Sequence, residues 1–141
     1  MKRRDVLKGL SAGAGLLAMG VGGAAMGETT SETVFELRVY HTLEGKLDDL
    51  LARFRDHTVA IFARHGMVSV AYWTPLDEPL KGRTLFYILK HPSRDVATTN
   101  WAAFRADPEW VKVRTDSEAK GKIVEKTEST FMKLTDFSPK V

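Results

Sequence analysis

One short alternating stretch limits the possible folds of this chain more than any other feature. Residues 35–41, FELRVYH, alternate between apolar and polar side chains, which is the period of a β-strand with two different faces. One face is apolar, and the other carries a carboxylate, a guanidinium and a phenol, from Glu36, Arg38 and Tyr40. The stretch therefore predicts a sheet strand whose polar face meets either solvent or a cavity.

The patterns that follow give the order of the remaining elements. A helical stripe runs from about Leu47 to His65, and Gly66 is placed to end that helix. Ser93 is a predicted cap for one later helix, and Asp107-Pro108-Glu109 for the next. Strands are predicted over 34–40, 67–74, 84–90 and 129–134, and helices over 47–65, 94–106 and 108–120.

The order β-α-β-β-α-β predicts an α+β, ferredoxin-like fold with a four-stranded antiparallel sheet and helices on one face. The other face of such a sheet needs a cover, because large exposed apolar patches usually mark an interface. A second copy of the sheet supplies this cover most simply, so we expect a homodimer.

The N-terminal segment is predicted to be an export signal rather than part of the domain. Lys2, Arg3, Arg4 and Lys8 precede an uncharged Gly- and Ala-rich run that ends near residue 27. The Arg3-Arg4 pair and the apolar residues after it resemble the bacterial twin-arginine signal. The resemblance implies a periplasmic or otherwise exported protein, with a signal at 1–27, a polar linker at 28–33 and a domain at 34–141. The alternative is an uncleaved anchor, although the run is only weakly hydrophobic.

Charge and cysteine content exclude several classes of function. Residues 1–27 hold four of the 21 Lys and Arg residues and one of the 18 Asp and Glu residues, so 17 of each remain in 28–141. A domain with no net charge is a poor candidate for binding nucleic acid, which requires a basic surface. The chain has no cysteine, so it has neither disulfides nor thiolate metal sites.

Three segments together resemble the NIPSNAP family. They are FELRVYHTLEGKLDDLLARFRDHTVAIFARHGMVSVAYWT, the later ADPEWVKVR and the closing LTDFSPKV. The resemblance covers residues 35–141 and implies a dimeric α/β barrel, in which two four-stranded sheets close on each other. Related barrels include cofactor-independent monooxygenases, haem-degrading enzymes and stress-response proteins, but the family name implies no general reaction.

The barrel implied by the resemblance gives the polar row a role. We expect the apolar row of the first strand to pack on the helices, and Glu36, Arg38 and Tyr40 to face away from them, into the barrel. These three residues and Trp73 are the predicted ligand-binding residues. The alternative is that Glu36 and Arg38 only form ion pairs with neighbouring strands, for example with Lys133.

The histidines are the candidate proton-transfer groups, because imidazole titrates near neutral pH. His57, beside the apolar helical stripe, and His41, at the end of the first strand, are the tentative catalytic residues. His65 is interpreted as structural and His91 as a surface residue. No spacing of histidines and carboxylates indicates a metal site, and no nucleophile or phosphate-loop motif is present. We therefore expect neither a metal nor a cofactor.

Two readings of function remain open, with a weaker third. The first is an exported dimer that binds a small apolar or aromatic ligand, and that acts as a cofactor-independent monooxygenase or isomerase with Arg38 holding an oxyanion. The second is a non-catalytic binding or assembly dimer. The third is haem binding with a histidine as axial ligand. The sequence does not decide whether the protein is an enzyme.

Overall fold

A computed structural model describes residues 32–141, and residues 33–141 form one compact unit. The predicted export signal at 1–27, and the predicted linker up to residue 31, lie outside the described residues. In the described part of the chain, no helix is long and apolar enough to cross a bilayer.

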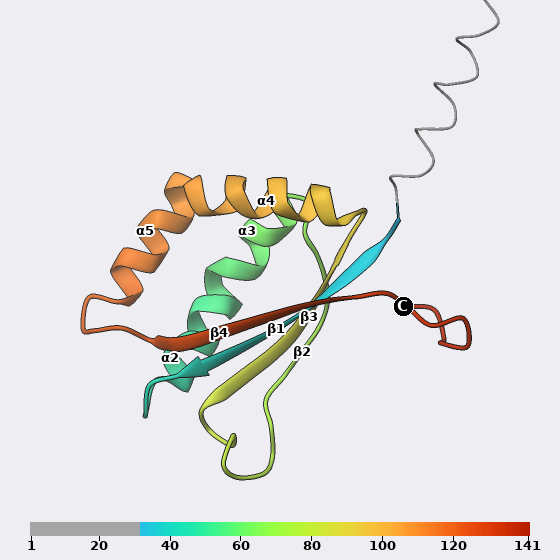
Figure 1. Cartoon of the computed structure of the whole chain (residues 1–141). Helices are drawn as coiled ribbons and strands as arrows, with labels where there is room; N and C mark the ends of the chain where they lie inside the picture. Colours follow the sequence, from blue (N-terminus) through green and yellow to red (C-terminus); the bar gives the residue numbers. More distant parts are fainter. Residues whose placement is uncertain (1–31) are drawn as a thin grey trace, which may run out of the picture. The chain divides into compact units, whose positions relative to one another are not determined.

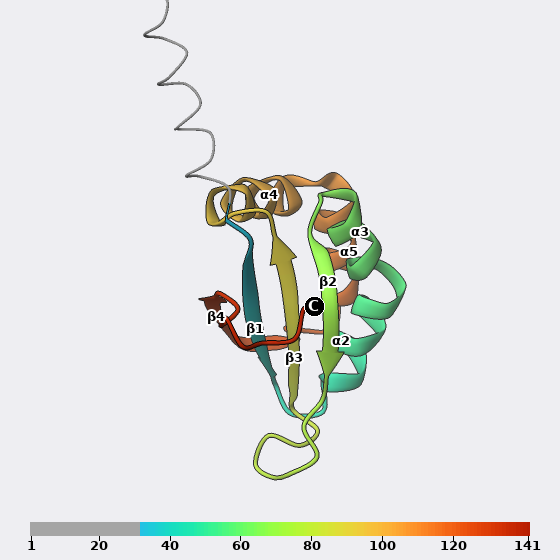
Figure 2. The same cartoon turned by 90° about the vertical axis from the view of Figure 1, so that its right-hand side faces the viewer.

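The sheet has the ferredoxin-like arrangement that the sequence predicts. Its strands are β1 (Val34–Thr42), β2 (Val68–Trp73), β3 (Thr84–His91) and β4 (Val124–Met132). They lie in the order β2-β3-β1-β4, and every neighbouring pair is antiparallel. β1 is a central strand, so its side chains are placed by neighbours on both sides (Figures 1 and 2).

All the helices of the described region lie on one side of this sheet (Figure 1). They are α2 (Leu47–Arg53), the π-helix η1 (Phe54–Thr58), α3 (Val59–Arg64), α4 (Arg94–Ala106) and α5 (Pro108–Ser117). Their apolar side chains meet Tyr87 and Leu89 of β3 in one core, to which Leu50, Phe54, Ile61, Phe62, Trp101 and Phe104 also belong.

The predicted starts of the two later helices and the predicted end of the first are confirmed. The Ser93 hydroxyl accepts a hydrogen bond from the Val96 amide at 3.1 Å, and the Asp107 carboxylate accepts one from the Glu109 amide at 2.8 Å. Pro108 is the first residue of α5. Gly66 follows the first helical segment with a φ of 77°, a value that glycine adopts without strain.

Three elements differ from the prediction. α5 ends at Ser117 rather than at residue 120. The first long helix contains a five-residue π-helical stretch, which the apolar spacing gave no sign of. The last strand begins at Val124 rather than at residue 129. Its first half is an exposed, charged edge that pairs only with β1, so it lacks the apolar alternation by which strands are recognised.

Within the described strands, the sheet face opposite the helices carries two exposed apolar side chains, while Phe35 and Val39 of β1 on the same face are buried. Trp73 and Val68 of β2 are 48% and 56% exposed there. The end of the chain also returns to this face, where the Lys90 side chain donates a hydrogen bond to the Val141 carbonyl at 3.2 Å. We call this surface, formed by the side chains that point away from the helices, the outer face.

Candidate functional site

The polar row of β1 faces the helices, so the predicted orientation of this strand was wrong. Glu36 accepts a hydrogen bond from the indole of Trp101 on α4, and Tyr40 packs edge-on against Phe54 of η1. The alternate row, which begins with Phe35, lies on the outer face. Alternation separates the two faces of a strand correctly, but it does not tell which face the helices cover.

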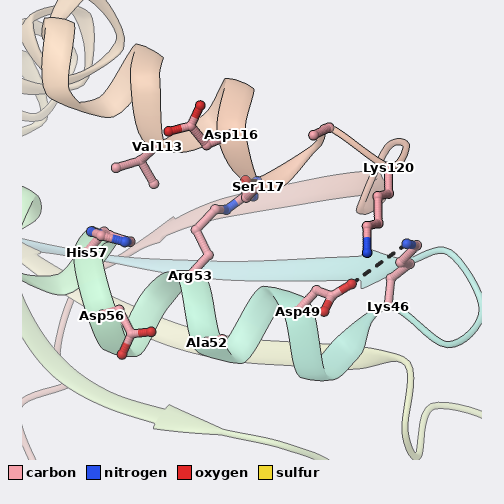
Figure 3. Close-up of a pocket in the computed structure, with 11 residues that line it drawn as sticks. Lys46, Asp49, Ala52, Arg53, Asp56, His57, Val113, Asp116, Ser117 and Lys120 are labelled. Atoms are coloured by element: carbon pink, nitrogen blue, oxygen red, sulfur yellow. Dashed lines mark hydrogen bonds and ion pairs between the residues drawn. The ribbon is translucent and has the colours of Figure 1, made fainter.

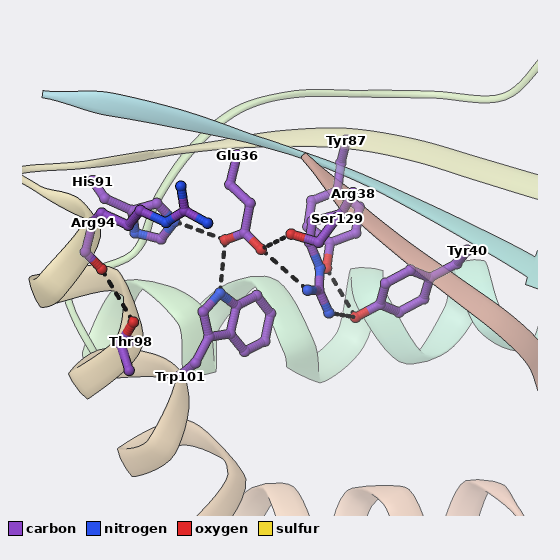
Figure 4. A network of polar contacts seen from close by, with 9 residues as sticks. All are labelled: Glu36, Arg38, Tyr40, Tyr87, His91, Arg94, Thr98, Trp101 and Ser129. Atoms are coloured by element: carbon purple, nitrogen blue, oxygen red, sulfur yellow. Dashed lines mark hydrogen bonds and ion pairs between the residues drawn. The ribbon is translucent and has the colours of Figure 1, made fainter. Parts of the chain in front are cut away.

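Glu36 lies at the centre of a buried hydrogen-bond network (Figure 4). One carboxylate oxygen accepts from His91 Nε2 at 3.0 Å and from Trp101 Nε1 at 2.7 Å. The other accepts from Arg38 Nη1 at 3.1 Å and from the Ser129 hydroxyl at 2.6 Å. The donors come from α4 and from three strands, so this carboxylate joins one helix to the sheet.

The network keeps Glu36 ionised although the residue is only 1% exposed. Burial alone would raise its pKa, but the hydrogen bonds from His91, Ser129 and Trp101, together with the positive charge of Arg38, lower the pKa from 4.5 to about 2. An ionised carboxylate can only accept, so the nitrogen of His91 that faces Glu36 carries a proton.

Arg38 and two tyrosines continue the network away from Glu36. The Arg38 guanidinium lies 4.3 Å from the centre of the Trp101 ring, and its Nη2 donates to the Tyr40 hydroxyl at 3.1 Å. The Tyr87 hydroxyl donates to the same oxygen at 3.0 Å. Burial raises the pKa of Tyr87 well above its ordinary value, so Tyr87 keeps the proton that it donates. Tyr40 therefore accepts two hydrogen bonds, and its own proton remains free to be donated.

The π-helix η1 sets where α2 ends and which side chains reach α5. In this wider turn the Val59 amide bonds to the Phe54 carbonyl five residues back, and the Thr58 hydroxyl bonds to the Arg53 carbonyl at 3.3 Å. Arg53 reaches α5, where it donates to Ser117 at 3.1 Å and lies 5.2 Å from the Trp110 ring centre. π-helical turns are frequently found at functional sites.

A cavity of about 350 Å³ lies between the sheet and helices α4 and α5. We call it the helix-side cavity. Arg38 and Tyr40 line it from the sheet, and Trp101, Phe104 and Trp110 line it from the helices. The ring centres of Phe104 and Trp110 are 4.7 Å apart, so these rings form a continuous aromatic wall. The remaining lining residues are mostly charged: Arg53, Arg105, Arg114, Glu118, Lys122, Val124, Glu125, Lys126 and Thr127.

The predicted site residues separate into two groups. Arg38 and Tyr40 line the helix-side cavity, and Glu36 lies behind Arg38. Trp73 lies on the outer face, paired with Phe86 of β3. His41 and His57 line other hollows. The structure therefore brings the three polar residues of β1 together, but not the other three candidates.

The two histidines predicted as catalytic lie at separate surface hollows. His57 is exposed and lines a hollow of about 410 Å³ between α2, η1 and α5, together with Asp56 and Asp116 (Figure 3). His41 lines another hollow near the loop before β3, and its Nε2 lies 3.6 Å from the Glu128 carboxylate. No histidine lines the helix-side cavity.

Sequence reasoning missed His91, which was predicted to be a surface residue. The structure contradicts this, because His91 is 1% exposed and bonds to Glu36. The signal was its position at the end of a strand on the same face as Leu85, Tyr87 and Leu89. His65 contacts Asp107 at 2.7 Å, which agrees with the structural role expected for it.

The histidine positions also bear on metal and haem binding. Among residues 32–141, no group of three or more His, Asp or Glu side chains could hold a metal ion. Because no histidine lines the helix-side cavity, this cavity offers no imidazole as an axial ligand for haem.

A comparison with protein-family models matches residues 35–139 to the NIPSNAP model. The chain belongs to the NIPSNAP family. A comparison with curated proteins finds no match. Among solved structures, a NIPSNAP-like domain protein from Burkholderia xenovorans superposes with a TM-score of 0.68 at 15% identity, covering 79% of this chain and 92% of that chain.

Two further structures widen the comparison of this NIPSNAP domain. A NIPSNAP family protein of unknown function from Agrobacterium tumefaciens has a TM-score of 0.66 and 23% identity, covering 77% of this chain and 94% of that one. SnoaB, a cofactor-independent oxygenase from Streptomyces nogalater, has a TM-score of 0.53 and 16% identity, covering 78% of this chain and 100% of that one. At these identities the likeness shows a shared fold.

Proposed function

We propose that this NIPSNAP domain binds a small aromatic ligand in the helix-side cavity. The observation that carries the proposal is the pairing of an aromatic wall with a free donor and a permanent cation on the sheet side of the cavity. Tyr40 has a proton to donate, and the Arg38 guanidinium bonded to it lines the same cavity. A ligand oxygen next to Tyr40 would accept this proton.

The same donors suit a ligand on which negative charge develops. An enol or phenol oxygen next to Tyr40 would accept its hydrogen bond, and the permanent charge of Arg38 would stabilise negative charge on that oxygen, including that of a ligand bound as its anion. Glu36 and Trp101 hold Arg38 in place beforehand, so little reorganisation accompanies the charge. These features support an isomerase or a cofactor-independent oxygenase, and the fold shared with SnoaB adds support for the latter.

The binding proposal is tested by titrating the purified protein with naphthol while its tryptophan fluorescence is followed. Binding should quench the fluorescence, because Trp101 and Trp110 line the cavity. Arg38→Ala should weaken the binding, and Trp73→Phe on the outer face should not. If Arg38→Ala binds naphthol with unchanged affinity, Arg38 is not part of the binding site. If the protein turns over a ligand, unchanged turnover in Arg38→Ala would likewise exclude a role for Arg38.

A non-catalytic assembly dimer is the second candidate, and in both this and the ligand-binding reading the outer face is the expected dimer contact. We propose that two copies associate through this face into a homodimer, because exposed apolar side chains such as Val68 and Trp73 on one sheet face often mark an interface. Trp73→Glu should then convert a dimer into a monomer in light-scattering measurements. A wild-type protein that is already monomeric would refute the dimer.

We also propose that residues 1–27 direct export by the twin-arginine route, so that the domain works outside the cytoplasm. The basic start and the Arg3-Arg4 pair support this. Cell fractionation of the wild type and of a variant with both arginines changed to lysine tests the proposal. An unchanged distribution in the variant would exclude this route.

A further inference from the structure

We infer that the aromatic ligand carries a carboxylate, held beside Arg105 at the exposed rim of the helix-side cavity, with the charge of Lys122 on the same lining adding to the attraction. This inference rests on the proposed function, because it concerns the ligand of the same cavity. It adds a second recognition point to the same cavity, formed by exposed cations rather than by Arg38 and Tyr40 of the sheet.

The lining of the cavity has an excess of positive charge. Six cationic side chains and two carboxylates line it. Two further carboxylates, Glu36 and Glu128, pair with lining cations from outside the cavity, with Arg38 at 3.1 Å and with Lys126 at 3.0 Å. After these are included, cations still exceed carboxylates by two, although the domain as a whole has no net charge.

The pairing pattern shows where that excess lies. Glu118 is shared between Arg53 at 3.4 Å and Arg114 at 3.6 Å. Arg105 at the end of α4 and Lys122 before β4 have no ion pair within the part of the chain that the structure describes. Both side chains are exposed, so they lie at the entrance rather than at the inner end.

A neighbouring hollow continues the cavity at this entrance. It has a volume of about 280 Å³ and shares Arg105, Trp110, Arg114 and Glu118 with the helix-side cavity. A ligand whose rings lie against Trp101 and Trp110 therefore has room for a substituent beside Arg105. A carboxylate suits this place, because it accepts two parallel hydrogen bonds from a guanidinium.

Glu125 is the carboxylate that opposes the inference, and it provides a control. It lines the cavity from β4, is exposed, and would repel a bound anion. Removing its charge should therefore strengthen anion binding, in the opposite direction to removal of Arg105 or Lys122. Lys112 on α5 is a matched cation outside the cavity, where it pairs with Asp116 at 2.6 Å.

The experiment compares two ligands of nearly equal shape, naphthoate and naphthamide, by calorimetric titration of the purified protein at low salt. Naphthoate should bind about tenfold more tightly, because two exposed cations each contribute modestly. Added salt should reduce this preference. The double variant Arg105→Gln/Lys122→Gln should abolish the preference for naphthoate and leave naphthamide binding unchanged. Glu125→Gln should increase the preference for naphthoate. Lys112→Gln should not alter this preference.

The possible results separate the inference from the proposed function. Equal binding of the two ligands would overturn the carboxylate inference and leave the aromatic site standing. A preference that survives the double substitution but disappears in Arg38→Met would place the anion at the inner end, and would also overturn it. Failure of both ligands to quench Trp101 and Trp110 or to release heat would overturn the inference together with the proposed site.

Discussion

Replacing Glu36 by Gln should destabilise the domain strongly, although the two side chains have nearly the same shape. Glu36 accepts four hydrogen bonds, two on each oxygen. A glutamine keeps one acceptor oxygen and presents an NH₂ group to the other two donors. The Ser129 hydroxyl can turn to accept from that group, but Arg38 cannot, so it would lose its counter-charge while its side chain is 16% exposed.

The size of the effect follows from two separate arguments. Removing one partner of a buried ion pair costs about 3–5 kcal/mol, and the partial exposure of Arg38 points to the lower end, about 3 kcal/mol. Lowering the pKa of Glu36 from 4.5 to about 2 also corresponds to about 3 kcal/mol of stabilisation. For a domain of this size, that loss should lower Tm by about 12 °C.

The dependence on pH identifies the cause. A lowered pKa in the folded state means that the stabilisation is present above about pH 4.5 and is lost as the pH falls towards 2. The Tm difference between wild type and Glu36→Gln should therefore shrink over this range in calorimetric scans. Glu128→Gln, at an exposed ion pair, is the control and should change Tm little. A Tm loss in Glu36→Gln of only a few degrees, or one independent of pH, would refute the reasoning.

Three further predictions concern single contacts. Tyr40→Phe should weaken binding of an oxygen-bearing aromatic ligand by about tenfold, because it removes the free donor of the cavity; Tyr72→Phe is the control, and equal losses in both would contradict the assignment. Ser93→Ala should cost about 1 kcal/mol in chemical denaturation, because it removes the cap of α4, and no loss would show that the cap is not formed in solution. Asp107→Ala should lower Tm further than Ser93→Ala does, because Asp107 also accepts from Arg64 and His65 at 2.7 Å; a smaller loss would contradict this ranking.

The fold could be predicted from the sequence because its signals are local. The helix starts at Ser93 and Asp107 and the glycine after α3 each depend on a few neighbouring residues, and the structure confirms them. The start of β4 was missed because an exposed edge strand needs no apolar row. The π-helix was missed because it shifts the apolar stripe by only one residue.

The candidate site could be predicted only in part. Arg38 and Tyr40 were predicted, from the alternation of β1 and the family resemblance, to bind a ligand on the sheet face away from the helices; the structure places them at a cavity on the opposite face. Their direction was wrong because the apolar row of this strand was expected to pack on the helices. Glu36 is buried against the helices because Trp101, Ser129 and His91 donate hydrogen bonds to its carboxylate. These donors lie 55 to 93 residues away in the chain, so no local sequence pattern reveals them.

The central claim is that this NIPSNAP domain holds its ligand between the sheet and helices α4 and α5. A crystal structure of the protein with naphthoate tests it most directly. We expect the rings against Trp101 and Trp110, with the Tyr40 hydroxyl facing the inner end of the ligand and the carboxylate beside Arg105. A ligand bound in the hollow beside His57, or against Trp73 on the outer face, would contradict the account.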